Sequence, residues 1–73
     1  MTESRIETAC IKRGLRMTGP RRIIARVLSD SDDHPDAEEL HRRANSLDHS
    51  ISLATVYRTV KLFEDYEIIE RHD

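Results

Sequence analysis

The stretch SLATVYRTVKLFEDY, residues 52–66, decides how the rest of the sequence is interpreted. Its apolar residues recur every three or four positions, which predicts an amphipathic helix over about 53–66 with Ser52 as its N-cap. Four of its residues are expected to be buried: Leu53, Val56, Val60 and Phe63. Tyr57 and Arg58 fall outside this apolar stripe. The helix therefore holds an aromatic side chain and a cation out toward solvent, which needs an explanation.

Three further helices and one strand are predicted around this helix. The helices span roughly Glu3–Arg13, Gly19–Ser29 and Ala37–Ser46, and the strand spans Ile68–His72. Gly14 is suited to end the first helix in a left-handed turn. Thr18 and Asp36 are suited to cap the next two. The expected fold is mainly α, a winged helix-turn-helix of four helices and the first strand of a wing, whose last helix enters the major groove of DNA.

The predicted core is aliphatic, because aromatic residues make up only 4% of the 73 residues. A chain of this length forms one small domain at most, and such a domain buries only ~60% of the surface that its unfolded chain exposes. Each of the first three helices contributes an apolar stripe: Ile6, Ala9 and Cys10; Ile24, Val27 and Leu28; Ala37, Leu40, Ala44 and Leu47.

The composition disfavours several classes of protein. Cys10 is the single cysteine, so no disulfide framework and no CxxC zinc pair can form, and a reducing cytoplasm is the expected location. Residues 1–8 lack the apolar run of a signal peptide, and no segment approaches the ~20 apolar residues of a membrane span. An enzyme is the weakest hypothesis, because no nucleophile–base pair and no glycine-rich loop is found.

Charge is distributed unevenly along the chain, although the net charge is only −2. Residues 11–26 hold six basic residues and no acidic one, whereas residues 30–39 hold six acidic residues and no Lys or Arg. Because local charge sets the local field, a basic face can bind a polyanion on a mildly acidic chain. The same pattern is also typical of helix faces that are merely solvated.

The face of the 53–66 helix opposite its apolar stripe carries Ala54, Tyr57, Arg58 and Lys61. Arg58 and Lys61 can bind phosphates or the acceptors of guanine, and Tyr57 can lie against thymine methyl groups. Ser52 and Thr55 add hydroxyls and free N–H groups at the helix start, where anions bind readily. This face is therefore a candidate surface for reading DNA.

Other interpretations of the exposed pair stay open at this point. In the simplest one, Tyr57 is half-buried against the third helix and Arg58 pairs with Glu64 or Asp65. In another, the winged helix contacts a protein, with Tyr57 as the anchor residue. That second interpretation predicts binding that is insensitive to salt and to DNA sequence.

A third interpretation is a small metal-binding module built on residues 30–39 and His34. One imidazole cannot hold a transition metal tightly, because regulatory sites need several ligands. No constellation of ligands is found for His41, His49 and His72, which are expected to be ordinary structural or surface histidines. Cys10 is expected to be a small buried residue.

Four stretches of the sequence resemble the DNA-binding domain of the ferric uptake regulator (Fur) family. They are GLRMTGPRRIIARVL, DDHPDAEELHRR, ISLATVYRTVKLFED and IIERHD, and together they cover about Gly14 to Asp73. The most specific parts are A-T-V-Y-R at Ala54–Arg58 and T-x-x-R at Thr18–Arg21. The segment HPDAEELxRR resembles the alphaproteobacterial branch, which includes iron- and manganese-responsive proteins.

The resemblance implies that residues 1–73 are the winged-helix DNA-binding domain of a metal-responsive repressor, without its C-terminal metal-binding and dimerisation domain. In the family, two chains dimerise through that domain and close onto A/T-rich, partly palindromic operators. The implied partners are double-stranded DNA and a second copy of the protein, and no membrane partner is expected. The implied cofactor of the full-length protein is a divalent metal, iron or manganese, with zinc as a further candidate; none is expected for residues 1–73 alone.

The resemblance also assigns roles to individual positions. Tyr57 and Arg58 match the major-groove readers, and Arg16 matches a basic residue that enters a narrow A/T-rich minor groove, where cations are attracted. Ser52, Thr55 and Arg21 match positions expected to contact the DNA backbone. His34 matches a metal ligand whose companion ligands lie in the second domain.

The sequence departs from the family pattern just after the 53–66 helix. Family members often have Ala-Gly where this sequence has Tyr66-Glu67, and the glycine would end the helix in a left-handed turn. The helix is therefore expected to run on or to end with strain. A lone strand at Ile68–His72 would leave backbone groups unpaired on both sides, so we expect the sequence to be a piece cut inside a hairpin.

Overall fold

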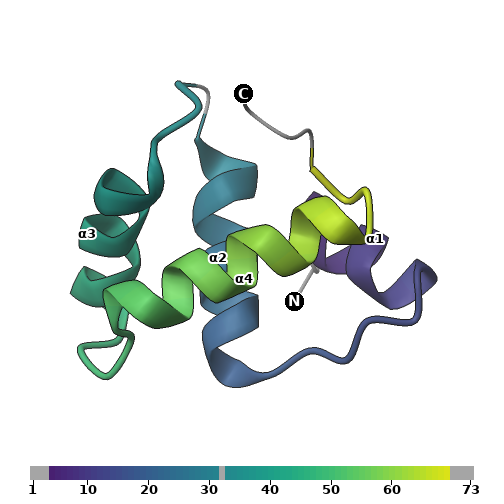
Figure 1. The fold of residues 1–73 in the computed structure, drawn as a ribbon, viewed down its shortest axis with the longest axis horizontal. Coiled ribbons are helices and arrows are strands. Elements are labelled where there is room, and N and C mark those ends of the chain that lie inside the picture. Colours follow the sequence, from purple (N-terminus) through teal and green to yellow (C-terminus); the bar gives the residue numbers. More distant parts are fainter. Residues whose placement is uncertain (1–3, 32, 70–73) are drawn as a thin grey trace.

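Four helices make up most of the computed structural model, which describes residues 4–31 and 33–69 (Figure 1). They are α1 (Arg5–Lys12), α2 (Gly19–Asp30), α3 (Ala37–Leu47) and α4 (Leu53–Asp65). Helix α2 packs against the other three, and α4 also packs against α3. Figure 1 shows α4 crossing in front of α2, with α3 near its first turn and α1 near its last. The four helices agree with those predicted, within one to two residues at most ends.

Each helix begins at a side chain that caps it. The capping oxygens of Ser4, Thr18, Asp36 and Ser52 accept hydrogen bonds from the backbone N–H three residues later. Such a cap satisfies one of the N–H groups that the first turn leaves without an intrahelical partner. Three of these caps are the ones predicted from the sequence, and the fourth fixes the start of α1.

Helices α1 and α4 end in the same kind of turn. Gly14 and Glu67 both have left-handed backbone, with φ of 79° and 57°. In each turn the next N–H bonds back over five residues: Leu15 to the carbonyl of Cys10 at 2.9 Å, and Ile68 to that of Phe63 at 2.8 Å. Helix α4 therefore stops without glycine, in the strained conformation that was one of the two expected outcomes.

The core is a single cluster drawn from all four helices and two connecting segments. Its buried apolar residues are Ile6, Cys10, Leu15, Ile24, Ala25, Val27, Leu40, Ala44, Ile51, Val56 and Phe63. Most were expected at these positions because they share the apolar stripe of their helix. Aliphatic side chains dominate the cluster, as predicted, and Phe63 is its largest member.

Several predicted core positions are less buried than expected, and one of them, Leu47, is wrong. On α4 the buried residue between Val56 and Phe63 is Thr59, whereas Val60 and Leu53 are only partly buried. The buried face is therefore rotated slightly from the predicted one. Leu47, expected in the core, is 68% exposed and is the last residue of α3. Ala9, Leu28 and Ala37 are also only partly buried.

The predicted strand at Ile68–His72 is not observed in the part that the structure describes. Ile68 and Ile69 follow α4 in an irregular bend and pack against the core. Residues 70–72 lie outside the described residues. Within residues 4–31 and 33–69 the fold is thus the helix-turn-helix part of the expected architecture, and none of its helices combines the length and hydropathy needed to cross a membrane.

Candidate nucleic-acid interface

The solvent-facing side of α4 is the first part of the candidate interface. Tyr57 is 51% exposed, and Ala54, Arg58 and Lys61 are exposed beside it. The opposite side of the helix carries the buried residues, so the core holds α4 firmly while this face stays open. The sequence predicted this division correctly for all four exposed residues.

Arg58 makes only a weak contact with its own helix. Its Nε donates to the carbonyl of Ala54 over 3.4 Å, a long distance for a hydrogen bond. A guanidinium has five N–H donors, so most of them stay available for a ligand. Among the described residues Arg58 has no carboxylate partner, contrary to the interpretation that paired it with Glu64 or Asp65. Asp65 instead forms an exposed ion pair with Lys61 at 3.8 Å.

A shallow groove joins the two most specific sequence motifs. Thr18, Pro20 and Arg21 at the start of α2 face Thr55, Arg58, Thr59 and Leu62 on α4 across a volume of about 280 Å³. Two guanidinium groups and several hydroxyls therefore surround one small space. Such a set suits a phosphate, because Arg binds its oxygens through charge-assisted hydrogen bonds and hydroxyls donate to them.

Arg21 also braces the loop that carries Arg16. Its Nη1 donates to the carbonyl of Arg16 at 2.7 Å, while the side chain of Arg16 is exposed. The loop between α1 and α2 is thereby tied to the first turn of α2. Arg21 thus has a structural contact in addition to the phosphate contact expected of it.

The start of α4 offers a second place for an anion. The hydroxyl of Ser52 accepts from the N–H of Thr55 at 3.1 Å and lies 3.0 Å from the hydroxyl of Thr55. The N–H of Val56 bonds to the carbonyl of Ser52. Within the described residues this leaves the N–H groups of Leu53 and Ala54 for a ligand, at the positive end of the helix dipole.

Two of the six basic residues of segment 11–26, Arg22 and Arg26, share one buried carboxylate, although their own side chains are about half exposed. Glu7 of α1 is fully buried, and its carboxylate accepts from Arg26 at 2.9 Å and from Arg22 at 3.2 Å. Burial alone would raise the pKa of Glu7, but hydrogen bonds from Arg26 and Ser4 outweigh that effect and lower it. This contact was not predicted from the sequence. Its only sign was that Glu7 shares a helix face with Ile6 and Cys10.

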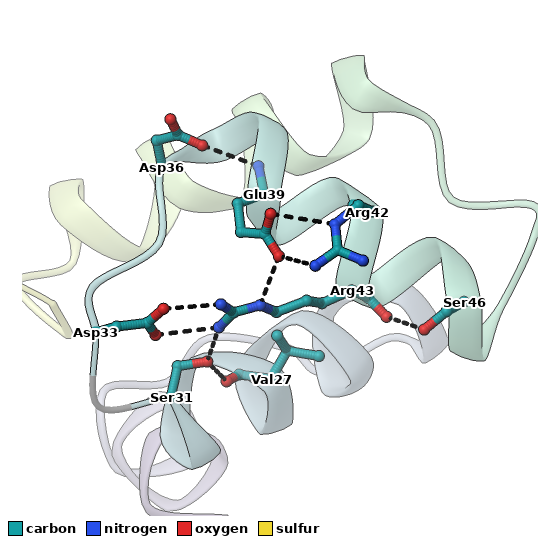
Figure 2. Close-up of polar contacts among 8 residues, drawn as sticks. All are labelled: Val27, Ser31, Asp33, Asp36, Glu39, Arg42, Arg43 and Ser46. Atoms are coloured by element: carbon teal, nitrogen blue, oxygen red, sulfur yellow. Dashed lines mark hydrogen bonds and ion pairs between the residues drawn. The ribbon is translucent and has the colours of Figure 1, made fainter.

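Arg43 of α3 binds two carboxylates of the acidic segment 30–39, those of Asp33 and Glu39, as Figure 2 shows. The guanidinium makes two hydrogen bonds to Asp33, at 2.8 and 3.1 Å, and one each to Ser31 and Glu39 at 2.9 Å. Glu39 also accepts from Arg42. The hydrogen bond from Arg43 lowers the pKa of Asp33, and those from Arg42 and Arg43 lower the pKa of Glu39. These carboxylates brace the α2–α3 connection.

His34 lies next to this network, on the α2–α3 loop. It is exposed, with left-handed backbone at φ 48°, and it lines one edge of a groove of about 670 Å³ together with Ile6, Leu40, Val60 and Ile69. No group of three or more His, Cys, Asp or Glu side chains that could hold a metal ion occurs among the described residues. The described part of this chain therefore does not form a metal site by itself.

Two other histidine predictions can be compared with the structure. His41 lies on α3 and contacts the backbone of Ile51, a structural role consistent with the expectation for it. His49 is exposed in the α3–α4 turn, and His72 lies outside the described residues. Cys10 is buried as expected, and burial raises the pKa of its thiol.

The arrangement of α2, α3 and α4, with an aromatic–cationic face on the last helix, defines a helix-turn-helix domain. The chain belongs to the ferric uptake regulator family, whose family model, described as "Ferric uptake regulator family", matches residues 12–73. The resemblance drawn from the sequence motifs is therefore confirmed. Membership places the chain among transcriptional regulators rather than enzymes.

Relatives with assigned names support this membership. The chain is 63% identical over 68 residues to the ferric uptake regulation protein of Rhizobium leguminosarum bv. viciae, covering 93% of this chain and 48% of that protein. It is 58% identical over 59 residues to the ferric uptake regulation protein of Brucella suis biovar 1 (strain 1330), covering 81% of this chain and 42% of that protein. Both organisms fit the branch suggested by the HPDAEELxRR segment.

Two solved structures share the fold closely. A manganese uptake regulator superposes with a TM-score of 0.90 at 57% identity, over 100% of this chain and 53% of that one. A zinc-bound manganese uptake regulator superposes with a TM-score of 0.91 at 60% identity, over 96% of this chain and 53% of that one. The chain thus spans about half the length of the relatives that it matches.

Proposed function

We propose that residues 1–73 form the winged-helix DNA-binding domain of a metal-responsive transcriptional repressor that acts in the cytoplasm. In this proposal α4 lies in the major groove of A/T-rich, partly palindromic operators. The observation that carries the proposal is the exposed face of α4, where Tyr57, Arg58 and Lys61 stand free of the core. The groove that joins this face to the start of α2 supports it further.

The two readers would act on different parts of the base pairs. The ring of Tyr57 lies against thymine methyl groups, which suits A/T-rich sequence. Arg58 uses its uncommitted N–H donors on base acceptors in the same groove. Ala54 leaves room for the helix to approach the bases closely. Arg16 enters the adjoining minor groove, which is narrow in A/T-rich DNA and attracts cations.

The remaining contacts would hold the DNA backbone. Arg21 and Thr55 bind one phosphate in the groove between α2 and α4, with Thr18 beside them. Ser52 and the free N–H groups of the first turn bind a second. Lys61 reaches a third after exchanging Asp65 for the phosphate, since an exposed ion pair of this kind is worth little. These contacts set register and affinity but carry no sequence information themselves.

The metal would act through a second domain. His34 would supply one ligand to a divalent iron, manganese or zinc site that a C-terminal domain completes, and two copies of the whole protein would pair through that domain. The names of the relatives, which refer to ferric and manganese uptake and to bound zinc, support this choice of metals. Pairing would raise affinity, because one bound half gives the other a high effective concentration.

A salt titration of DNA binding tests the proposal directly. Binding of the 73-residue chain to a duplex that contains an A/T-rich palindrome should weaken steeply as salt rises, because phosphate contacts release counterions. Affinity that does not depend on salt would favour the protein-contact interpretation and would overturn the proposed function.

A further inference from the structure

The backbone carbonyl of Ile51 is held by two side chains from α3. It lies 3.1 Å from Nε2 of His41 and 3.0 Å from Nδ2 of Asn45, and both contacts are partly buried. His41 and Asn45 are one helical turn apart, so they reach the carbonyl from the same face of α3. Ile51 comes directly before Ser52, the N-cap of α4. The contacts therefore hold the point at which the chain enters its DNA-reading helix.

The rest of the α3–α4 turn is held just as completely. Asn45 also donates to the carbonyl of His49 at 3.2 Å, which uses the second hydrogen of its amide. Asp48 accepts from the N–H of Ser50 at 2.9 Å. The side chain of Ile51 is 1% exposed and belongs to the core. Ile51 is thus fixed on both sides, by packing of its side chain and by hydrogen bonds to its carbonyl.

Because Ile51 is fixed at both its side chain and its carbonyl, it sets the position of the exposed face of α4 that carries Tyr57 and Arg58. The face begins at Ala54, three residues after Ile51, and Tyr57 follows within one turn. A shift or tilt at Ile51 would move Tyr57 and Arg58 together relative to α3 and the groove. Hydrogen bonds to bases weaken steeply with distance and angle, whereas phosphate attraction is long-ranged and tolerant. Loss of the fixation should therefore affect sequence discrimination more than overall DNA affinity.

We infer that His41 and Asn45 are positioning residues for DNA reading, which set the sequence discrimination of the domain through the carbonyl of Ile51 and without contact to DNA. This inference rests on the proposed function of α4. It also requires a hydrogen on Nε2 of His41, because a carbonyl can only accept. His41 is therefore in the Nε2–H tautomer when it is neutral.

The test uses neutral substitutions, so that the charge facing DNA stays constant. The double variant His41→Leu, Asn45→Leu removes both donors, and His41→Gln is the matched control because its amide supplies a donor at similar reach. Discrimination is the ratio of Kd for a scrambled duplex to Kd for an A/T-rich palindrome, measured by fluorescence anisotropy. Circular dichroism checks that each variant keeps its helices. If the double variant folds poorly, the single variant His41→Leu takes its place in the comparison.

We expect the Leu substitutions to lower the discrimination ratio about tenfold, the scale on which one well-placed base contact acts. Affinity for the scrambled duplex should change less than about twofold, because no phosphate contact is lost. For the same reason the slope of log affinity against log salt should stay nearly the same. His41→Gln should keep most of the wild-type ratio. Equal loss of affinity on both duplexes, or an unchanged ratio in both Leu variants, would overturn the inference while leaving the proposed function intact.

Imidazole ¹⁵N shifts of the unliganded wild-type chain give a second test that needs no DNA. A protonated Nε2 on neutral His41 supports the contact with Ile51, and the Nδ1–H tautomer overturns it. A wild-type chain that does not discriminate between the duplexes would overturn both the proposed function and this inference. The tautomer distinguishes the two failures, because it reports the Ile51 contact whatever α4 binds.

Discussion

Glu67 ends α4 with the same left-handed turn that Gly14 supplies to α1. Their φ values are 57° and 79°, and both turns close with a hydrogen bond over five residues. A residue with a Cβ is strained in this region by roughly 1–2 kcal/mol, whereas glycine is not. The ion pair of Glu67 with Arg13, at 3.9 Å and well exposed, offsets little of that strain.

Glu67→Gly should therefore stabilise the domain by about 1 kcal/mol, as measured by urea unfolding. Gly14→Ala is the reverse control, because it places a Cβ in the same kind of left-handed turn, and it should destabilise the domain by about the same amount. A Cβ at Gly14 would meet no atom within 4 Å, so its cost is conformational rather than steric. Loss of stability in Glu67→Gly would contradict the left-handed end of α4.

Glu7→Gln should destabilise the domain by about 2 kcal/mol near neutral pH, because charge-assisted hydrogen bonds from Arg22 and Arg26 are weakened. The folded pKa of Glu7 lies below its ordinary value of 4.5. A lowered folded pKa gives stability that is present above about pH 4.5 and is lost as pH falls through the folded pKa.

The difference in unfolding free energy between wild type and Glu7→Gln should therefore shrink as the solution is acidified. Urea unfolding at a series of pH values measures that difference. Wild-type and variant curves that stay parallel throughout the acid range would show that Glu7 is not an ionised, buried partner of the two arginines.

The network in Figure 2 predicts distinct effects for two neighbouring arginines. Arg43→Met should return the pKa of Asp33 toward its ordinary value, because the hydrogen bond from Arg43 is the main cause of its shift. Arg42→Met should raise the pKa of Glu39 and leave Asp33 unchanged, since Arg42 contacts only Glu39 in this network. Carboxyl titration by NMR separates the two variants. Equal responses of Asp33 in both would contradict the hydrogen bonds drawn for Arg43.

Arg21→Ala should weaken binding to all duplexes about equally and lower the slope of log affinity against log salt by about one. Arg16→Ala is the contrasting variant. It should mainly reduce the preference for A/T-rich sequence, because a narrow minor groove attracts its cation. Affinity measured across salt on A/T-rich and G/C-rich duplexes distinguishes the two. Because Arg21 also holds the carbonyl of Arg16, a change in sequence preference in Arg21→Ala as large as that in Arg16→Ala would show that Arg21 acts through the Arg16 loop and not on a phosphate.

The sequence predicted those features that depend on near neighbours. Thr18, Asp36 and Ser52 were recognisable as caps because each bonds to an N–H only three residues away. The exposed face of α4 followed from helical periodicity. The orientation of the buried face of α4 was not predicted exactly. Thr59 has the shape of a valine, and packing against α2 and α3 decides which side of α4 faces inward.

Contacts between distant residues could not be predicted in the same way. Glu7 and Arg26 are 19 residues apart, and Arg43 and Asp33 are 10 apart, so no local pattern joins them. Arg22 and Arg26 are therefore less available to a ligand than the charge pattern of segment 11–26 suggested. The groove between Thr18 and Arg58 likewise depends on how α2 crosses α4, which periodicity does not fix.

The most direct test of DNA reading by α4 is fluorescence anisotropy of the chain on an A/T-rich palindrome and on a scrambled duplex, across salt. Tyr57→Ala and Arg58→Ala should each cost on the order of 1–3 kcal/mol on the palindrome, and together they should abolish the preference for it. Arg5→Ala on α1 matches the loss of one charge and should keep the preference. Equal wild-type binding to both duplexes, or no binding at low salt, would contradict a DNA-reading α4 and favour a protein partner.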